Sequence, residues 1–454
     1  MASGLRHLGK VRNLCRYGGI VDNGIRSLSS SSVAVKSDEK ALGGNEDSSA
    51  AQMPYSLFMW GTNQKGSIPL PDILEEGKSG SSTSNLLKSK RVYDHPMQID
   101  LEKAYGIDNK SVTIKSMHCG PLATACVLSD GRCFLHGDNS FGQLGNGDLN
   151  DALVPEIMSP PESSSLHLDQ VESISLGSQF SAVIDKKGDL YTFGYGGSVM
   201  KEGIGNLGHG DAESYYTPTL VQSLVEDGVY AKQVAVGVSH MTVLTTEGEV
   251  LTAGAGSYGR LGNLETYDQL FLEPIELLQS EKIQHVANGK EFSAALTTEG
   301  IVFCWGRNDK GQCGTGAGLS VDVYAMEPLP LPVEGVLEGR KVVKVDTGYA
   351  HAAAITEQGE LFMWGSGLHH QPELMTDLLG KNIVDLACGQ NYTIALDDQG
   401  QIHTFGKGKT GVLGLANETS LNQPTHVEGL SKYKVAKLSA GWSHVACLVQ
   451  PSES

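Results

Sequence analysis

Apolar and polar residues alternate along most of this chain in short stretches, and glycines separate these stretches. Residues 294–296 and 301–305 are an example, because the turn-forming pair Glu299-Gly300 lies between two apolar stretches. Short apolar stretches bounded by such pairs are typical of β-strands joined by tight turns. The pattern therefore predicts a protein built from short antiparallel strands rather than from helices.

The glycines recur at fixed spacings that divide the chain into repeated units. Each unit opens at an anchor glycine, has a second glycine eleven residues later, and has a third glycine seventeen residues after the anchor. The anchors of the six complete units are Gly120, Gly177, Gly237, Gly289, Gly348 and Gly389. One such unit cannot bury both faces of its small sheet, so neighbouring units must pack on one another. A closed ring of blades is the usual arrangement for a period of 41–60 residues.

The two ends of the chain supply the two halves of a seventh unit. A seventh anchor, Gly441, is followed by one apolar stretch and then by the end of the chain, with no third glycine. Residues 55–61 read as the missing strand, because they lead into a glycine in the same way. We therefore predict an all-β fold over residues 53–450, a seven-bladed β-propeller of four-stranded antiparallel blades. Pairing of the N-terminal and C-terminal strands is expected to close the ring.

Three short motifs in these units resemble the repeat of the regulator of chromosome condensation family. They are the G-x-x-H motif at 237–240, the pair Trp305-Gly306, and the G-Q-L-G motif at 142–145. The resemblance covers about 400 residues and implies a seven-bladed propeller. One fold hosts many activities, so the resemblance by itself does not specify a function.

The N-terminal segment differs in charge from the rest of the chain and indicates an organelle address. The whole chain has a formal charge of −18, yet residues 1–36 hold six basic side chains and one acid and end in a serine-rich run. Such a composition is typical of a transit peptide. We predict a transit peptide at 1–36, a flexible linker at 37–52 and a tail at 451–454. The mitochondrial matrix is the favoured compartment, the chloroplast is the runner-up, and a tail without an address is the remaining alternative.

Charge, hydropathy and motif context exclude several classes of function. A strongly acidic chain is unsuited to coating nucleic acid phosphates over a broad face. No apolar run approaches the length of a membrane span, and no CxxC pair suggests a zinc site. Three GxGxxG strings, at 203–208, 254–259 and 406–411, lack the following helix that a dinucleotide site requires. We therefore expect no cofactor, no metal and no enzymatic activity.

Three histidines recur at one position of the repeat and are candidates for either packing or metal binding. His240, His351 and His444 each lie three residues after an anchor glycine. Other units have Phe180 or Phe292 at the same position. Because histidine interchanges with aromatic residues there, we interpret the position as one that needs a ring for packing or for holding a turn.

The positions after each anchor glycine are the candidate partner-binding residues, because equivalent turns of a ring face one rim. The side chains that we select are Gln179, Lys290, Glu291, Tyr349, Gln390, Asn391 and Trp442. Aromatic and long polar side chains at the centre of a surface are frequent energetic anchors of interfaces. In members of the resembled family that exchange nucleotide on a small GTPase, acidic and histidine residues of these turns meet the partner. Glu291 is the only acid among these positions.

Departures from the repeat mark further candidate surfaces. They are the polar segment 77–90, an insertion within 194–210, a proline-bearing loop at 315–340, and the sequence SGLHHQPELM, which replaces the G-x-L-G segment in the fifth unit. Insertions in repeat proteins often form the binding face, although each could equally be neutral variation in a surface loop.

Two hypotheses for function follow. The first is a non-enzymatic mitochondrial scaffold that binds a protein or ribonucleoprotein partner on one rim. The resemblance suggests organelle ribosome assembly, transcript processing or respiratory-complex biogenesis for it. The second is a guanine-nucleotide exchange factor for a small or dynamin-like GTPase. In either case we expect a monomer.

Overall fold

The structure, a computed structural model, describes residues 55–69, 91–108, 112–158, 166–167, 169–198, 204–316, 325–333 and 335–452. The chain divides into two units, Met1–Gln52 and Met53–Ser454, and every described residue belongs to the second. The predicted transit peptide, the predicted linker and the segment 77–90 lie outside the described residues, as do 199–203, 317–324 and residue 334 of the other insertions.

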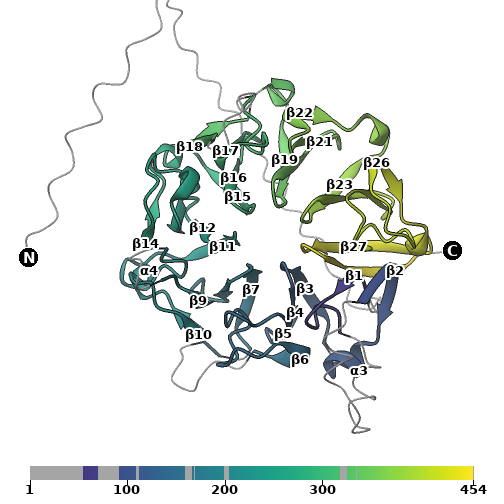
Figure 1. The fold of residues 1–454 in the computed structure, drawn as a ribbon, viewed down its shortest axis with the longest axis horizontal. Coiled ribbons are helices and arrows are strands. Elements are labelled where there is room, and N and C mark those ends of the chain that lie inside the picture. Colours follow the sequence, from purple (N-terminus) through teal and green to yellow (C-terminus); the bar gives the residue numbers. More distant parts are fainter. Residues whose placement is uncertain are drawn as a thin grey trace, which may run out of the picture. The chain divides into compact units, whose positions relative to one another are not determined.

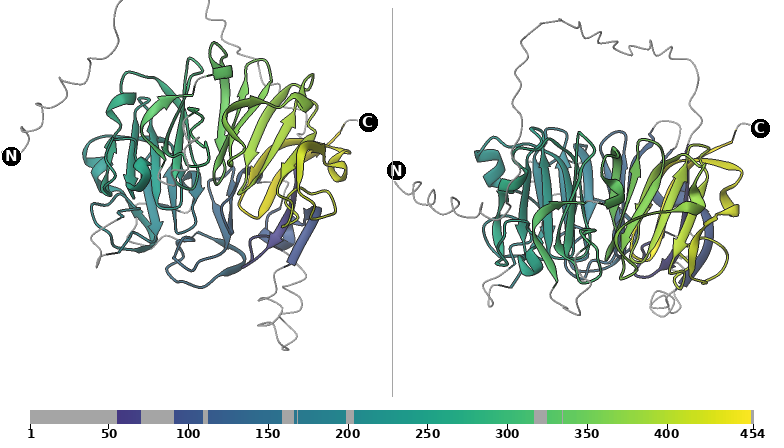
Figure 2. Two further views of the ribbon diagram at one scale, coloured as in Figure 1. Left: turned by 45° about the horizontal axis from the view of Figure 1, so that its top comes forward. Right: turned by 90° about the horizontal axis from the view of Figure 1, so that it is seen from above.

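Seven four-stranded antiparallel sheets surround a central axis, as Figure 1 shows in a view along that axis. This arrangement confirms the predicted fold class, an all-β seven-bladed propeller. We number the blades from the first complete repeat and letter the strands of each blade A to D from the axis outwards. Seen from the side, the strands run between the two faces of the ring (Figure 2, right).

The first four blades follow one another along the chain. Blade one comprises β3 (Ile114–Cys119), β4 (Ala123–Leu128), β5 (Cys133–Gly137) and β6 (Ala152–Ile157). Blade two comprises β7 (Val171–Leu176), β8 (Phe180–Asp185), β9 (Leu190–Gly194) and β10 (Tyr215–Leu220). Blade three comprises β11 (Ala231–Val236), β12 (His240–Thr245), β13 (Val250–Gly254) and β14 (Gln269–Pro274). Blade four comprises β15 (Ile283–Asn288), β16 (Phe292–Thr297), β17 (Val302–Arg307) and β18 (Met326–Pro332).

The remaining blades complete the ring, and short helical turns connect some of the strands. Blade five comprises β19 (Val342–Thr347), β20 (His351–Thr356), β21 (Leu361–Gly365) and β22 (His369–Leu374). Blade six comprises β23 (Ile383–Cys388), β24 (Tyr392–Asp397), β25 (Ile402–Gly406) and β26 (Leu421–His426). Blade seven comprises β27 (Tyr433–Ala440), β28 (His444–Pro451), β1 (Ser56–Asn63) and β2 (Arg91–Ile99). The described helical turns are α3 (Leu101–Tyr105), α4 (Gln222–Glu226), η2 (Ser257–Gly259), η3 (Glu276–Leu278), η4 (Gly335–Leu337), η5 (Thr376–Leu378) and η6 (Glu428–Leu430).

Blade seven is assembled from both ends of the propeller, which confirms the predicted closure of the ring. Its strand order is β2-β1-β28-β27, so the two outer strands come from the N-terminal side. Antiparallel pairing places Trp60 opposite Val445 and Gly61 opposite His444. The ring is therefore closed by hydrogen bonds between strands that are far apart in the sequence.

The hydrophobic core lies between blades rather than inside any one of them. At the interface of blades six and seven, Ile394 of β24 packs in one cluster with Trp60 of β1 and Val445 of β28. At the interface of blades four and five, Leu296 of β16 shares a cluster with Val345 of β19 and Trp364 of β21. Each sheet thus buries its faces only by stacking on its neighbours, as expected for a repeat protein.

Side chains satisfy the unpaired edges of the innermost strands. The amide oxygen of Gln233 on β11 accepts a hydrogen bond from Val286 N on β15 (3.2 Å), and its amide nitrogen donates to Val286 O (3.0 Å). Asn288 Nδ2 donates to Ala235 O at 2.9 Å in the opposite direction. Buried backbone groups at a strand edge need such partners, so these polar residues hold neighbouring blades in register.

Two sets of connections form one face of the ring, which we call the anchor face. It consists of the A–B turns, which contain the anchor glycines, and the C–D loops. Backbone hydrogen bonds join the two sets, for example Asp138 N to Leu122 O at 3.0 Å and Ala255 N to Ser239 O at 2.7 Å. Residues that follow different anchors are therefore brought to the same face, although they are far apart in the sequence.

No helix among the described residues is long and apolar enough to cross a membrane.

Candidate functional site

Four of the seven predicted partner-binding residues form one connected group on the anchor face. Lys290 and Glu291 lie in the turn between β15 and β16, Tyr349 lies between β19 and β20, and Trp442 lies between β27 and β28. All four side chains are half-buried. We call them, together with the arginines described below, the mouth cluster, because Lys290 and Trp442 also line the central channel.

The aromatic part of the mouth cluster joins the A–B turns of blades four, five and seven. Lys290 Nζ lies 4.9 Å from the centre of the Tyr349 ring, a cation–π distance. The Tyr349 and Trp442 rings meet edge to face, with centroids 5.5 Å apart and an interplanar angle of 69°. Burial alone lowers the pKa of Lys290, but its hydrogen bond to Tyr349 and the charge of Glu291 raise the pKa above its ordinary value. The ammonium group is therefore charged at neutral pH.

Glu291 is held from three sides by cations of its own chain. Its carboxylate lies 2.7 Å from Arg307 Nη1, 3.4 Å from Arg260 Nη2 and 3.6 Å from Lys290 Nζ. Partial burial by itself raises the pKa of this carboxyl group, but the hydrogen bond from Arg307 and the charges of Arg260 and Lys290 outweigh burial and lower it. The carboxylate is therefore committed to internal ion pairs.

The two arginines extend this network into the C–D loops. Arg307 also bonds Asp309 through Nε and Nη2, at 2.9 and 2.8 Å, and its guanidinium lies 4.6 Å from the centre of the Tyr258 ring. The side chain of Arg260 is only 5% exposed, and its Nε donates to Ser257 O at 2.8 Å. Arginine suits such a site because its planar group can bond carboxylates and stack on a ring at once.

Our sequence reasoning missed Arg260, Arg307, Asp309 and Tyr258. Arg260 occupies the variable position of a G-x-L-G motif, and Arg307 directly follows Trp305-Gly306. A single charged residue at a variable position of a repeat carries no signal of its own. Its partnership with Glu291 becomes visible only once the A–B turns and C–D loops are known to meet on one face.

The other three predicted residues do not join the mouth cluster. Gln179 in blade two contributes its backbone carbonyl, which accepts from Tyr195 N at 2.9 Å, and its side chain is half-buried. Gln390 in blade six is half-buried in the turn between β23 and β24. Asn391 lines a separate cavity between blades five and six. Proximity was expected for all seven residues. Gln179 belongs to blade two and makes no described side-chain contact with the group. Gln390 and Asn391 belong to blade six, which lies between the blades of Tyr349 and Trp442, but they make no described hydrogen bond or ring contact with either residue.

The three repeat histidines are buried between blades. His240 Nε2 lies 3.0 Å from Ser293 Oγ, His351 Nε2 lies 3.0 Å from Thr393 Oγ1, and His444 Nε2 lies 2.7 Å from Thr124 Oγ1. In each pair the hydroxyl belongs to the next blade. Burial lowers the pKa of all three, to about 4 for His351 and about 3 for His444. They are neutral links between blades and are not available to a partner on the anchor face.

The central channel has a volume of about 380 Å³ and is lined by the innermost strands. It contains His118, His285, Lys344 and Asp346. Burial lowers the pKa of both histidines to about 4 and raises that of Asp346 to about 6, while Lys344 pairs with Asp385. No group of three or more His, Cys, Asp or Glu side chains in the described part of the chain could hold a metal ion.

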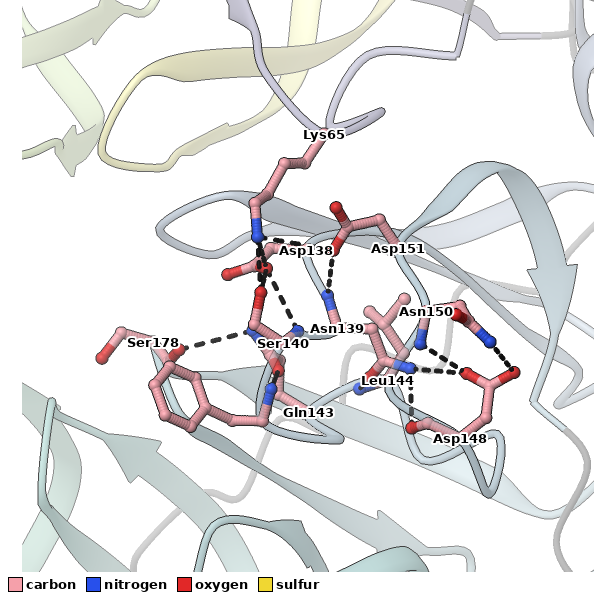
Figure 3. Close-up of polar contacts among 11 residues, drawn as sticks. Lys65, Asp138, Asn139, Ser140, Gln143, Leu144, Asp148, Asn150, Asp151 and Ser178 are labelled. Carbon is pink, nitrogen blue, oxygen red and sulfur yellow. Dashed lines mark hydrogen bonds and ion pairs between the residues drawn. The ribbon is translucent and has the colours of Figure 1, made fainter. Parts of the chain in front are cut away.

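A polar cluster also joins blade seven to blade one on the anchor face (Figure 3). Lys65 Nζ lies 2.5 Å from Asp138 Oδ1 and 3.5 Å from Asp151 Oδ1. Within the loop of blade one, Asn139 Oδ1 accepts from Leu144 N at 2.9 Å. Lysine is the cation of this cluster, so we read it as a link across the closure of the ring rather than as a metal site.

The sequence matches the family described as the RCC1-like domain over residues 201–453, and the regulator of chromosome condensation (RCC1) repeat over residues 130–184. The first match covers more than half of the 454 residues. The chain belongs to the RCC1-like family. The resemblance inferred from the repeat motifs is thereby confirmed.

Relatives of this RCC1-like protein include proteins of very different length. The RCC1 domain-containing protein RUG3, mitochondrial, of Arabidopsis thaliana is 30% identical over 426 residues, which cover 87% of this chain and 89% of that protein. The human E3 ubiquitin-protein ligase HERC2 is 26% identical over 411 residues, but the chain spans only 8% of its length. The crystal structure of Prp20p from Saccharomyces cerevisiae superposes with a TM-score of 0.71 at 19% identity, covering 88% of this chain and 92% of that chain. At that identity the likeness shows the fold alone.

Proposed function

We propose that this RCC1-like propeller is a non-enzymatic mitochondrial scaffold whose mouth cluster binds a protein or ribonucleoprotein partner. The observation that carries the proposal is the Lys290–Tyr349–Trp442 stack, which places a cation and two aromatic rings side by side at the opening of the channel. Half-buried aromatic and cationic side chains of this kind dominate the energy of many interfaces. Large apolar side chains exposed in the C–D loops of the same face extend the surface; they are Phe141, Leu149, Leu264, Tyr267 and Leu368.

The mitochondrial part of the proposal rests on two independent observations. The segment 1–36 has the composition of a transit peptide. RUG3, a relative whose name places it in mitochondria, is similar over nearly the whole length of both chains. Organelle ribosome assembly, transcript processing and respiratory-complex biogenesis are the processes in which we propose that the scaffold acts.

The alternative function, nucleotide exchange on a GTPase, has less support from the geometry. It draws on Prp20p, whose structure was described together with its binding to Gsp1p and histones. In this chain Glu291 is occupied by three internal cations, and the repeat histidines His240, His351 and His444 are buried between blades. The acidic and histidine groups that an exchange surface would present are thus engaged elsewhere.

Replacing Lys290 and Trp442 together by alanine is expected to lower partner recovery at least tenfold, about 1.4 kcal/mol, without unfolding the propeller. Glu291 is left in place because its removal would strand the buried Arg260 guanidinium without its carboxylate. The measurement is affinity capture from isolated mitochondria with tagged full-length protein, followed by quantitative mass spectrometry.

The matched control is Lys282→Ala with Tyr230→Ala, which removes an exposed lysine and an exposed tyrosine from the opposite face. This control should retain full recovery. Ribosomal or RNA-processing proteins among those lost from the Lys290/Trp442 variant would support the scaffold. A GTPase whose nucleotide release is accelerated by the protein would support exchange instead. Equal recovery by the two variants would show that the mouth cluster is not the binding site.

A reporter fused to residues 1–36 is expected to enter mitochondria and to be shortened near the serine-rich run. The cationic, acid-poor segment responds to the membrane potential, which draws positive charge inward. Fluorescence microscopy and immunoblotting measure location and cleavage. Replacing the six basic residues by glutamine is the control and should leave the reporter in the cytosol. Import into chloroplasts, or a cytosolic location of the unmodified fusion, would contradict the mitochondrial assignment.

A further inference from the structure

In six of the seven blades, the C–D loop sends a short segment across to the next blade, and we call this segment the plug. Each plug buries one side chain between the two blades. The buried side chains are Ile68, Leu144, Leu207, Leu261, Cys313 and Leu413, all at most 2% exposed. Five of the plugs are the G-x-x-G segments of the repeat, and the sixth is the Gly66 segment of blade seven.

The glycines of a plug are required by how closely it approaches the next blade. In blade four, a Cβ on Gly311 would lie 2.7 Å from His370 Cα of the neighbouring strand D. A Cβ on Gly314 would lie 2.9 Å from Trp364 Cδ1 of the neighbouring strand C. Both glycines also have positive φ, 73° and 69°. The plug therefore fits against the outer strand and against one aromatic side chain of the next blade.

Backbone hydrogen bonds fix five plugs to the outer strand D of the next blade. The acceptor occupies the same position on each of these strands. In the blade that receives the plug, the third glycine of the repeat pairs with one residue of strand D, and the next residue of strand D provides the acceptor carbonyl. The bonds are Gly147 N to Tyr216 O, Gly210 N to Leu270 O, Leu264 N to Pro328 O, Gly316 N to His370 O, and Ala416 N to Asp94 O, at 2.8–3.0 Å. One carbonyl on each of these five outer strands thus serves as the docking point for a plug.

A plug carbonyl also accepts a hydrogen bond from the next blade. Ser67 O accepts from Thr124 Oγ1 at 2.8 Å, and Arg260 O accepts from Ser293 Oγ at 3.3 Å. These two hydroxyls are the ones that contact His444 and His240, so each forms a chain of histidine, hydroxyl and plug carbonyl. The hydroxyl donates to the carbonyl and accepts from the histidine, so the hydroxyl acts as both donor and acceptor.

Blade five has no plug, because residues 366–368 alone connect β21 to β22. Leu368 is 74% exposed instead of buried. Met363, which faces this gap from β21, is partly exposed, whereas the residues at its position in the other six blades are buried. The fifth unit, identified as degenerate from its sequence, therefore leaves the interface with blade six uncovered on the anchor face.

The uncovered interface is an apolar cavity of about 350 Å³ between blades five and six. Its lining includes Met363, Leu368, Phe405, Thr393 and Asn422. Phe405 is the residue before the third glycine of blade six. In other blades the aromatic side chain at this position is the one on which a plug packs; Gly145, for example, packs on Phe193 of blade two. We call this cavity the notch.

Two polar groups in the notch correspond to those that hold plugs elsewhere. Asn422 follows Leu421, which pairs with the third glycine Gly406, so its carbonyl is at the docking position of strand D. Thr393 Oγ1 contacts His351 Nε2 at 3.0 Å, which repeats the histidine–hydroxyl pair of the other blades. No described plug carbonyl reaches this hydroxyl, and no described plug N–H reaches the Asn422 carbonyl.

We propose that the notch binds a loop of a partner protein that presents a leucine-sized aliphatic side chain between two glycines, in the manner of the missing plug. The notch continues the interface that exists between all other blades, so the shape of its occupant is given by six examples in the same chain. The aliphatic side chain fills the space beside Met363 and Phe405. A carbonyl of the loop accepts from Thr393 Oγ1, and an N–H donates to Asn422 O.

A second copy of this chain is a poorer occupant, because each described plug is already seated on its own neighbouring blade. The proposal rests on the proposed function in one respect, namely that the anchor face binds protein. The notch and the mouth cluster are nevertheless different sites, since neither Lys290 nor Trp442 lines the notch. They can therefore be tested separately.

The test uses a head-to-tail cyclised, fluorescently labelled peptide with the sequence of residues 138–148, whose plug packs on a phenylalanine in blade two. Cyclisation reduces the ordering cost of a short loop. Fluorescence anisotropy with the full-length protein should show saturable binding. A peptide with Leu144→Asp, and one with Gly145→Val, should each bind at least tenfold more weakly, because the aliphatic side chain and the close approach are lost. An unmodified peptide that fails to bind overturns the proposal.

Variants of the protein locate the binding. Leu368→Asp changes an exposed side chain and should weaken peptide binding at least tenfold, whereas the control Leu277→Asp, 52% exposed and away from the notch, should not. Replacing residues 366–368 by residues 138–151 should seat a plug in the notch and abolish peptide binding. The double substitution Lys290→Ala with Trp442→Ala should leave peptide binding unchanged. Equal peptide binding by the Leu368 and Leu277 variants would overturn the proposal for the notch. The proposal for the mouth cluster is tested separately, by partner recovery.

Discussion

Removing β1, residues Ser56–Asn63, is expected to abolish cooperative unfolding of the propeller and to cause aggregation. β1 lies between β28 and β2, so its loss separates the two halves of blade seven and leaves β28 as an unpaired edge. It also removes Trp60, which is fully buried and donates from Nε1 to Val412 O of blade six at 2.8 Å. Differential scanning calorimetry of the full-length protein and of the deletion variant measures the effect.

A single substitution tests the same closure with less disruption. Trp60→Ala should lower the free energy of unfolding by about 3–5 kcal/mol, since it deletes a large buried ring and strands a carbonyl of the neighbouring blade. Tyr267→Ala is the control, because this side chain is 75% exposed and should change stability by less than about 0.5 kcal/mol. A deletion variant that melts at the temperature of the unmodified protein would show that blade seven does not hold the ring together.

The fold could be predicted from the sequence because the repeat fixes both the strands and their number. Six units with the same glycine offsets give six blades, and the half-units around Gly441 and residues 55–61 give the seventh. The period of the pattern also separates strands from helices without reference to any contact. The outer strand of each blade could not be located in this way, because its alternation is too weak; the polar sequence RVYDHPMQI of β2 is an example.

The candidate site could be predicted only in part. Equivalent turns of a ring must share a face, which places Lys290, Tyr349 and Trp442 on one side. The sequence does not show which turns approach one another. The ring of Tyr349 in blade five contacts Trp442 in blade seven, whereas Gln390 in the blade between them joins no described ring contact. The pairing of Glu291 with Arg260 and Arg307 depends on how its turn meets the end of β17 and the C–D loop of the preceding blade, which no repeat spacing encodes.

The notch shows the reverse case, in which the sequence gives the signal and the structure gives its meaning. The replacement of G-x-L-G in the fifth unit is visible in the sequence. That the lost segment would have covered Phe405 of the next blade is visible only from the contacts of the other plugs. A missing repeat element can therefore create a site by uncovering residues, such as Phe405, that have ordinary core counterparts in the other blades.

The anchor glycines have a role that their spacing does not reveal. Five of the seven anchors lie so close to the next anchor that an added Cβ would meet its backbone carbonyl. A Cβ on Gly289 would lie 2.7 Å from Gly348 O, and a Cβ on Gly348 would lie 2.4 Å from Gly389 O. Across the closure, a Cβ on Gly441 would lie 2.2 Å from Gly120 O. Because these contacts recur around the channel, the anchors set how closely neighbouring blades approach one another at the centre of the ring.

Gly348→Ala is therefore expected to destabilise the propeller by about 3 kcal/mol, near the upper end for overpacking. The added Cβ would lie 2.2 Å from Cε1 of the buried His351 ring and 2.4 Å from Gly389 O, and neither the packed ring nor the backbone carbonyl has room to move aside. Gly228→Ala is the control: nothing lies within 4 Å of the added methyl group, and only the positive φ of 68° opposes it, at about 1 kcal/mol. Urea denaturation followed by circular dichroism measures both, with an unchanged slope showing that the denatured states are comparable. The anchors have no positive φ, so close approach is the property that this substitution tests. If the two substitutions cost the same, close approach does not explain the anchors, and the ring is looser at its centre than these contacts imply.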